Sequence, residues 1–287
     1  MQHHITEELS QYGYQSIQML GKGKFGEIYL VQAPDGTKYA CKIAEGERER
    51  EILRREGKLQ ETLRHPLFAA YHDMFQTEKR SYLIMEYVEG ESLHTLFRNG
   101  SLPYAMDKIN FIQFIRYLAI SLAEGVAYLH DRPDPILYRD LKPEHVIISK
   151  NGIKLLDLGC AAPLSVANQT KAGTKGFAAP EQLGEPEEKQ GTYSDIYGLG
   201  KVLEWILRDM DRKGQNARDV QFRRIVQITQ ECTRIHPMER ISSMRILICE
   251  IREKPCKYGI FWKNEFQYIK NICYEKNFDN WQNKQKN

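Results

Sequence analysis

The chain of 287 residues is long enough for one bilobal domain or for two small ones. Apolar residues make up 41% and charged residues 28%, a balance that excludes disorder for most of the chain. The net charge is only +3 and no block of lysines and arginines stands out, so nucleic-acid binding is not expected.

Six cysteines are scattered along the chain and none forms a CxxC pair. This spacing argues against a zinc site or a disulfide framework, and we expect reduced thiols in a cytoplasmic protein. The first residues lack the apolar run of a signal peptide, and no stretch reaches the roughly 18 apolar residues that span a bilayer. We therefore expect no transmembrane segment in this chain.

The first 88 residues predict a sheet with one helix. Residues rich in β-formers, bounded by turn signals, predict strands at 17–20, 28–31, 39–43, 67–76 and 81–88. The charged segment 45–63 predicts a helix, in which Gly57 is awkward because glycine costs about 1 kcal/mol relative to alanine.

Helical periodicity dominates the rest of the chain. Apolar residues recur at spacings of three and four at Ile109, Ile112, Ile115, Leu118, Leu122, Val126 and Leu129, and again at Ile196, Leu199, Val202, Leu203 and Ile206. Ser242 is a candidate cap for a further helix that must stop before Pro255. A strand-rich half followed by a helical half predicts an α+β chain with two lobes.

A glycine-rich segment, Gly21 to Ile28, fits the pattern GxGxxGxV. Glycines allow backbone N–H groups to approach phosphate oxygens, although a tight hairpin needs the same residues. Strands are predicted on both sides, which argues against a dinucleotide-binding fold. Lys42 follows on a strand among apolar neighbours, where it is either a surface lysine or the partner of an anion such as phosphate or a helix carboxylate.

Two further segments carry catalytic potential. Residues 138–145, Tyr-Arg-Asp-Leu-Lys-Pro-Glu-His, place Asp140 beside Lys142, and such an aspartate can orient a hydroxyl nucleophile and take its proton. Residues 154–159 place Asp157 between an apolar strand and a glycine, which suits a Mg²⁺ ligand. Joint occurrence of the two segments makes ordinary charged loops a poor explanation.

Residues 14–255 thus resemble the eukaryotic-type (Hanks-type) Ser/Thr protein kinase family. The resemblance implies a bilobal α+β protein kinase fold. Its small β-rich N-lobe with one main helix would be residues 14–88, and its larger, mainly helical C-lobe would be residues 89–256. Residues 1–13 and 257–287 would be extensions.

The resemblance also implies ATP-site residues. Gly21, Gly23 and Gly26 would cover the ATP phosphates, and Lys42 would bind the α- and β-phosphates while pairing with Glu56, with Glu51 as the alternative partner. Met85 resembles the gatekeeper. The remaining residues implied to contact the adenine are Glu86 to Val88 in the hinge, and Ile28, Ala40 and Ile147 around the ring.

Catalytic roles follow in the same way. Asp140 resembles the catalytic base, Lys142 the catalytic-loop lysine of Ser/Thr kinases, and Asp157 the metal-binding aspartate. Arg139 marks the type of kinase whose activation segment can be ordered by phosphorylation, with Ser165, Thr170 and Thr174 as candidate sites. We hypothesise that Thr170 is autophosphorylated, because the position of Thr174 implies a contact with Asp140 and Lys142.

Three downstream elements separate protein kinases from small-molecule phosphotransferases. Residues 173–181 resemble the peptide-binding segment, Ser194 to Gly200 resemble the helix whose Asp195 braces the catalytic loop, and Arg240 matches the arginine that pairs with Glu181. The amino-acid sequences of residues 176–182 and 194–200 look most similar to those of bacterial members of the family. The three elements together disfavour a small-molecule phosphotransferase.

His145 is the main departure from the family pattern, because it stands where asparagine binds the second metal ion. Imidazole offers nitrogen, whereas Mg²⁺ prefers oxygen and Mn²⁺ accepts nitrogen more readily. Tyr138 and Leu158 are milder departures. The chain is interpreted as an ATP-dependent Ser/Thr protein kinase using Mg²⁺ or Mn²⁺, with protein hydroxyls as substrate. The alternative is a nucleotide-binding pseudokinase that acts as a switch or scaffold.

The last 31 residues, 257–287, combine aromatic and lysine residues. This composition can mark a contact with a partner or a membrane surface, and it also fits a helix packed on the C-lobe or a frayed terminus.

Overall fold

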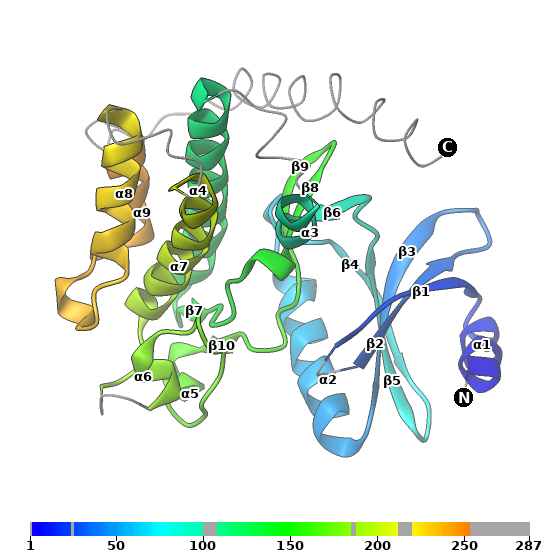
Figure 1. The fold of residues 1–287 in the computed structure, drawn as a ribbon. Helices are drawn as coiled ribbons and strands as arrows, with labels where there is room; N and C mark the ends of the chain where they lie inside the picture. Colours follow the sequence, from blue (N-terminus) through cyan, green and yellow to red (C-terminus); the bar gives the residue numbers. More distant parts are fainter. Residues whose placement is uncertain (1, 24–25, 100–107, 185–187, 212–219, 253–287) are drawn as a thin grey trace. The chain divides into compact units, whose positions relative to one another are not determined.

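The computed structural model describes residues 2–23, 26–99, 108–184, 188–211 and 220–252. The chain divides into two compact units (Figure 1). One unit comprises Met1–Glu89 and Leu156–Gly159, and the other comprises Gly90–Leu155 and Cys160–Asn287. The α+β organisation predicted from the sequence, strands followed by helices, is confirmed.

The first unit is built on an antiparallel sheet with strand order β1-β2-β3-β5-β4. Its strands are β1 (Gln15–Gly23), β2 (Gly26–Gln32), β3 (Lys38–Glu45), β4 (Tyr71–Gln76) and β5 (Arg80–Glu86). The strand expected over 67–76 is shorter than predicted, because it begins only at Tyr71. The predicted helix 45–63 is present as α2 (Glu47–Thr62).

Alternation along the strands sorts side chains onto the two faces of this sheet. Cys41 and Ile43 of β3 belong to one apolar cluster, whereas Ala44 belongs to another that includes Leu53 of α2. Because successive strand residues point to opposite faces, Lys42 points to the same face as Ala44. The alternation of side chains along β3 thus explains why Lys42 faces α2.

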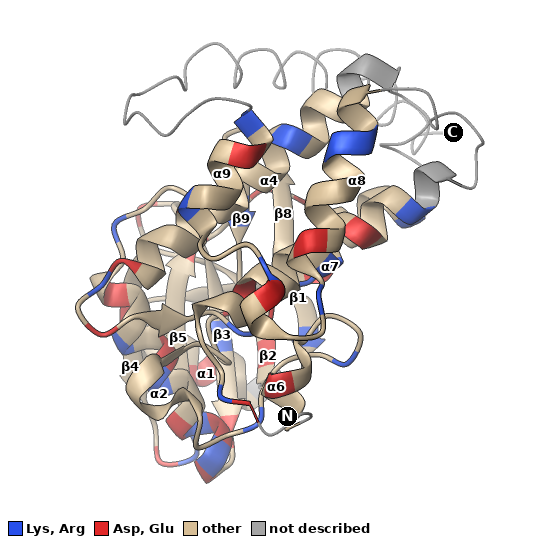
Figure 2. Ribbon diagram, turned by 90° about the vertical axis from the view of Figure 1, so that its left-hand side faces the viewer, with Lys and Arg blue, Asp and Glu red and all other residues tan. Residues whose placement is uncertain are grey.

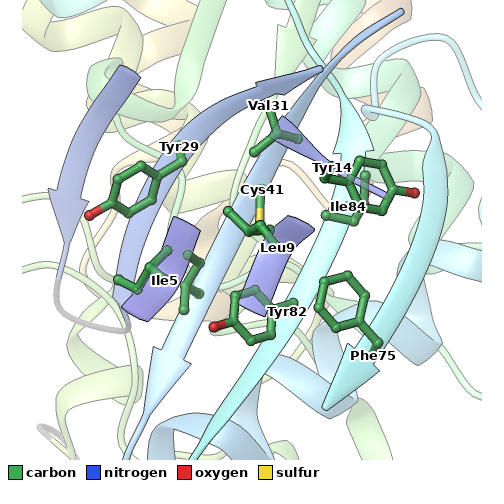
Figure 3. Close-up of a cluster of buried hydrophobic side chains, with 10 residues drawn as sticks. Ile5, Leu9, Tyr14, Tyr29, Val31, Cys41, Phe75, Tyr82 and Ile84 are labelled. Carbon is green, nitrogen blue, oxygen red and sulfur yellow. The ribbon is translucent and has the colours of Figure 1, made fainter. Parts of the chain in front are cut away.

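The opposite face is covered by α1 (Gln2–Gln11), a helix in the segment expected to be an extension. Figure 3 shows Ile5 and Leu9 of α1 among the aromatic and aliphatic side chains of the strands, and both are buried. Glu8 of the same helix accepts hydrogen bonds from Arg80 and from the Tyr82 hydroxyl of β5. The helix is therefore anchored to the sheet by apolar packing and by an ionic contact.

Gly57 has a packing role within α2. A Cβ atom at this position would lie 2.7 Å from the Met74 sulfur and 3.3 Å from a Leu83 methyl carbon. The glycine that weakens the helix allows α2 to lie close to β4 and β5, the strands that carry these two residues.

In its described residues the second unit is mainly helical, with two small sheets. Its strands are β6 (Gly90–Ser92), β8 (Val146–Ser149) and β9 (Gly152–Leu155) in one sheet, and β7 (Ile136–Leu137) and β10 (Ala162–Pro163) in the other. Its helices are α3 (Leu93–Arg98), α4 (Lys108–His130), α5 (Leu164–Ala167), α6 (Pro180–Leu183), α7 (Thr192–Asp211), α8 (Val220–Cys232) and α9 (Met244–Arg252). Short 3₁₀ turns occupy Pro143–His145 and Pro237–Glu239.

The long helix α4 forms the core of this unit. Its stretch Phe111–His130 is long and apolar enough to cross a membrane, which differs from the expectation that no stretch reaches that length. However, 78% of the stretch is buried inside the protein, and α4 packs against α7 and α9. Its apolar character is accounted for by burial in the core.

The cap predicted for α9 differs by one residue from the structure. Ser243 accepts a hydrogen bond from the Ile246 backbone N–H, so Ser243 rather than Ser242 caps the helix. Among the cysteines, Cys41, Cys160 and Cys232 are free thiols as expected. Cys249 is disulfide-bonded, and the expectation of reduced thiols is wrong for that residue.

Charges of both signs occur along the exposed helices. Figure 2 shows acidic and basic residues interspersed on α2, α8 and α9. The aromatic and basic segment 257–287 lies outside the described residues, and its contact with a partner or a membrane surface stays a prediction.

Candidate active site

Lys42, Glu56 and Asp157 meet on the face of the first unit that α2 covers. The Lys42 ammonium donates to Glu56 Oε2 at 2.7 Å and to Asp157 Oδ1 at 2.9 Å. The pairing predicted for Lys42 and Glu56 is therefore confirmed, whereas Glu51 pairs with Arg54 on the same helix. Glu56 also accepts a hydrogen bond from the Leu158 backbone N–H at 3.2 Å, so one carboxylate holds both the lysine and the segment after Asp157.

The protonation of this cluster follows from its burial and its charges. Burial alone would lower the pKa of the Lys42 ammonium, but the carboxylates of Glu56 and Asp157 outweigh burial and raise that pKa. Burial raises the pKa of Glu56, an effect that the Lys42 ammonium opposes. Lys42 is a protonated donor over the physiological range, and it is suited to hold an anion.

The glycine-rich segment includes the end of β1 and the start of β2. Gly26 has a φ of 142°, and a Cβ atom there would lie 2.0 Å from the Ile43 carbonyl oxygen. Only glycine fits this close approach to β3, the strand of Lys42. Gly23 pairs with Gly26, and Gly21 pairs with Ile28. These glycines therefore lie beside the strand pairs that carry the predicted nucleotide contacts.

The residues predicted to contact adenine are divided between the two units. Ile28 pairs with Lys42 across β2 and β3, and Ala40 pairs with Met85 across β3 and β5. Met85 is buried against α2, where the Gln60 amide lies 3.7 Å from its sulfur.

Glu86 ends β5, and its backbone N–H donates to the Ala70 carbonyl at 2.8 Å. Val88 follows and packs against the cluster that contains Leu53. Ile147 lies on β8 of the second unit, paired with Ser92 and Lys154. Ile28, Ala40, Met85 and Glu86 thus lie on neighbouring strands of the first unit, whereas Ile147 belongs to the second unit.

Asp140, Lys142 and Thr174 form a closed network in the second unit. The Lys142 ammonium donates to Asp140 Oδ2 at 2.8 Å and to the Thr174 hydroxyl oxygen at 2.9 Å. The Thr174 hydroxyl donates to Asp140 Oδ1 at 2.6 Å. The contact that the resemblance implied for Thr174 is confirmed, and Asp140 is held as an acceptor by two groups.

Asp195 at the start of α7 supports the loop that carries Asp140. Its carboxylate accepts the Tyr138 backbone N–H at 2.8 Å and the Arg139 backbone N–H at 2.7 Å. The side chain is buried, and His130 also lies 2.8 Å from it. The bracing predicted for Asp195 is confirmed.

Arg139 and Asp157 both adopt left-handed backbone conformations, with φ values of 66° and 67°. In the described residues these are the two non-glycine residues with positive φ. Such backbone costs about 1–3 kcal/mol and persists where surrounding contacts determine it. Strain is therefore located beside the predicted base and at the predicted metal ligand.

His145 ends the 3₁₀ turn that follows the catalytic loop. Its Nδ1 atom lies 3.1 Å from the Asp140 carbonyl oxygen, 3.4 Å from the Tyr138 hydroxyl and 3.7 Å from Asp140 Oδ2. A carbonyl oxygen accepts only, so this contact assigns the proton of the neutral ring to Nδ1 and a lone pair to Nε2. His145 thus contacts the backbone of Asp140, and its role as a metal ligand stays a prediction.

Three candidate phosphorylation sites have different surroundings. Ser165 donates to the Asp134 carboxylate at 2.8 Å, an acidic neighbour that would repel a phosphate. Thr174 is engaged with Asp140 and Lys142. Thr170 is exposed and its hydroxyl oxygen lies 3.2 Å from Arg139 Nη1, so the hypothesis that Thr170 is autophosphorylated keeps its physical basis.

Glu181 and Arg240 form a buried two-point ion pair, as predicted. Arg240 Nη1 and Nη2 lie 2.6 Å and 3.0 Å from the two carboxylate oxygens of Glu181. Both side chains are fully buried, and Ser194 adds a hydrogen bond to Glu181 at 2.8 Å. The pair ties α6 to the turn before α9.

Sequence reasoning missed the buried amides of Gln182 and Gln190. Gln182 donates to the Arg139 and Ala172 carbonyls, and Gln190 donates to the Ala167 and Thr170 carbonyls. Neither residue belongs to a motif with a local signature. The available signal was the position of Gln182 directly after Glu181, in a segment already singled out.

Comparisons with known proteins agree with this arrangement. The family model for the protein kinase domain matches residues 14–257. An Aurora kinase of Eremothecium gossypii is 30% identical over 219 residues, which cover 72% of this chain and 56% of that protein. Serine/threonine-protein kinase pkn2 of Myxococcus xanthus is 33% identical over 211 residues, covering 68% of this chain and 24% of that protein.

Serine/threonine-protein kinase 36 of Pongo abelii is 30% identical over 199 residues, 66% of this chain. The chain spans from 14% to 56% of the length of these three relatives. The family model covers well over half of the chain and coincides with the residues that build the two clusters around Lys42 and Asp140. The chain therefore belongs to the protein kinase domain family.

Proposed function

We propose that this chain is an ATP-dependent Ser/Thr protein kinase, which transfers the γ-phosphoryl group to protein hydroxyls. The observation that carries this proposal is the assembled Lys42–Glu56 ion pair, at 2.7 Å, with Asp157 on the same ammonium. In protein kinases that pair and the metal-binding aspartate must both be in place. The relatives are named Aurora kinase and serine/threonine-protein kinase, and these names support phosphoryl transfer to proteins as the reaction.

Asp140 is proposed as the catalytic base. Its carboxylate would accept the proton of the substrate hydroxyl, and Lys142 would balance charge on the transferred group. Lys142 donates to both Asp140 and Thr174, so the lysine and the base share one hydrogen-bond network. Catalysis would come mainly from positioning and electrostatic stabilisation, because phosphoryl transfer leaves little covalent chemistry to the protein.

The proposed nucleotide contacts follow from the resemblance to the kinase family. Gly21, Gly23 and Gly26 would approach its phosphates, and Lys42 would hold the α- and β-phosphates. The remaining proposed contacts are to the adenine, from Met85, Glu86, Val88, Ile28, Ala40 and Ile147. Met85 is buried beside Gln60, which supports its proposed place at the inner end of the adenine site.

Asp157 and His145 are proposed as the metal-binding residues. Asp157 offers a carboxylate with about 29% of its side chain exposed, and His145 offers an imidazole whose Nε2 carries the lone pair. A bound divalent ion would neutralise phosphate charge as the phosphoryl group moves. Within the described residues no three His, Cys, Asp or Glu side chains gather as a complete metal site, so phosphate oxygens would supply further ligands.

A nitrogen ligand such as the His145 imidazole is expected to favour Mn²⁺ over Mg²⁺. Mg²⁺ favours oxygen ligands, whereas imidazole suits transition metals. We therefore propose that this kinase works better with Mn²⁺ than family members with asparagine at this position. The observation that favours the alternative, a nucleotide-binding pseudokinase, is His145 itself, because loss of the second metal would leave binding without transfer.

The test is transfer of labelled γ-phosphate from ATP to Ser/Thr and Tyr peptide libraries, with Mg²⁺ and with Mn²⁺. Wild type is expected to label Ser/Thr peptides, and His145→Asn is expected to gain rate with Mg²⁺. Measurable ATP binding without transfer by either metal would instead establish the pseudokinase.

Origin and location are also proposed. A bacterial-type kinase is supported by the 33% identity with the Myxococcus xanthus protein, although Aurora kinases are similarly close. A cytoplasmic location is proposed from the sequence, and fractionation of the source cells would test it.

A further inference from the structure

Arg139 donates hydrogen bonds to several uncharged acceptors of the activation segment and to Gln190. Its Nε donates to the Cys160 carbonyl at 2.7 Å, and its Nη1 lies 3.0 Å from the Ala167 carbonyl and 3.2 Å from the Thr170 hydroxyl oxygen. The Gln190 amide oxygen lies 3.4 Å from the same nitrogen. The arginine side chain therefore already contacts the segment that a phosphate on Thr170 would be expected to order.

Gln190 contacts both Arg139 and the activation segment. Its side-chain nitrogen donates to the Ala167 and Thr170 carbonyls, each at 3.0 Å, while its oxygen faces Arg139. Its backbone N–H donates to the Asn168 side chain at 2.6 Å. Gln190 is only 5% exposed, so these hydrogen bonds are sheltered from water.

Gln182 extends the same pattern toward the catalytic base. Its amide nitrogen donates to the Arg139 carbonyl at 2.8 Å and to the Ala172 carbonyl at 3.2 Å. Thr174, two residues after Ala172, donates to Asp140 at 2.6 Å. The segment 167–174 is thus connected to the loop of Asp140 by the uncharged Gln182 amide and by the Thr174 hydroxyl.

We propose that Gln190 is a positioning residue that orders the activation segment without phosphorylation. Its amide supplies an acceptor to Arg139 and two donors to the segment. A phosphate would supply acceptors only, so it cannot replace the two donated hydrogen bonds. Phosphorylation of Thr170 is compatible with this proposal, but kinase activity would not depend on that phosphorylation. The inference rests on the proposed kinase function for its activity readouts, and has a separate readout in segment order.

Segment order is measured first, by hydrogen–deuterium exchange on protein treated with phosphatase. Amides of residues 160–182 are expected to be protected in wild type and in Thr170→Ala, and to exchange faster in Gln190→Ala. Gln230→Ala is the matched control, because Gln230 is an exposed glutamine on α8. Rapid exchange of the segment in unphosphorylated wild type would overturn the proposal, whether or not the protein transfers phosphate.

Activity provides the second readout. Unphosphorylated wild type and Thr170→Ala are expected to have equal kcat, and Gln190→Ala is expected to raise the KM for peptide while leaving the Kd for ATP unchanged. Thr170→Glu should add nothing to wild type but should restore part of the activity of Gln190→Ala, since a carboxylate then takes up Arg139. A wild type that gains tenfold or more on Thr170 phosphorylation, or a Gln190→Ala variant with unchanged peptide KM, would contradict the proposal.

Discussion

The Lys42 ammonium lies 2.7 Å from the Glu56 carboxylate, and both side chains are almost fully buried. Replacing Glu56 by Gln keeps the shape but removes the charge that balances Lys42. Since misplacement of a binding group by about 1 Å can cost 10²-fold in rate, we expect kcat/KM to fall by about that factor. Steady-state kinetics with ATP varied would measure it.

Glu51→Gln is the matched control on the same helix, because Glu51 is exposed and pairs with Arg54 rather than with Lys42. It should leave kcat/KM within about twofold, as expected for an exposed pair. Equal losses in the two variants would show that charge on α2, rather than the contact with Lys42, matters.

The buried pair of Glu181 and Arg240 should contribute strongly to stability once one partner is removed. Arg240→Ala would leave a carboxylate buried without its cation, at a cost of about 3–5 kcal/mol in the free energy of unfolding. Urea denaturation would measure it. Arg245→Ala breaks an exposed pair with Asp131 and should cost no more than about 1 kcal/mol. A small effect at Arg240 would mean that water reaches the pair.

The N-terminal helix should contribute to the stability of the first unit. Leu9 is fully buried under the sheet (Figure 3), so Leu9→Ala is expected to lower the free energy of unfolding by about 2–5 kcal/mol. Thr6→Ala, on the exposed side of α1, should change it by less than about 0.5 kcal/mol. The melting temperatures of both variants, compared with that of wild type, would test this expectation. Equal melting temperatures would indicate that α1 is detached in solution.

Cysteine reactivity should follow burial. Burial raises the pKa of the Cys41 thiol, and it raises the pKa of Cys232 to about 12. Because the thiolate is the nucleophile, both should resist iodoacetamide at pH 8 in the folded protein, whereas the half-buried Cys160 should react sooner. Peptide mapping by mass spectrometry would follow each site. Labelling of Cys41 as fast as Cys160 before unfolding would contradict this.

Motifs with local spacing predicted much of the site. Phosphate and hydroxyl chemistry requires certain residue types together, and these occur in the glycine-rich segment, at Lys42 and Glu56, and around Asp140. Strand alternation then explains why Lys42 faces α2. The ends of elements were predicted less well, as at Ser243, because two adjacent serines offer equivalent caps.

Contacts between distant segments could not be predicted in this way. Gln190 and Gln182 act through amide hydrogen bonds to backbone carbonyls, which any sequence provides. The anchoring of Glu8 by Arg80 and Tyr82 joins residues more than 70 positions apart. For Gly57 the sequence indicated only that glycine destabilises a helix. The close packing of α2 that this glycine allows depends on the position of Met74 on β4.

Phosphoryl transfer in a single turnover, measured alongside ATP binding, tests the central claim most directly. Wild type is predicted to transfer the γ-phosphate to a Ser/Thr peptide, and Asp140→Ala is predicted to bind ATP equally while losing about 10²–10⁴-fold in rate. A wild type that binds ATP but transfers nothing with Mg²⁺ or Mn²⁺, or an Asp140→Ala variant that transfers at the wild-type rate, would contradict it.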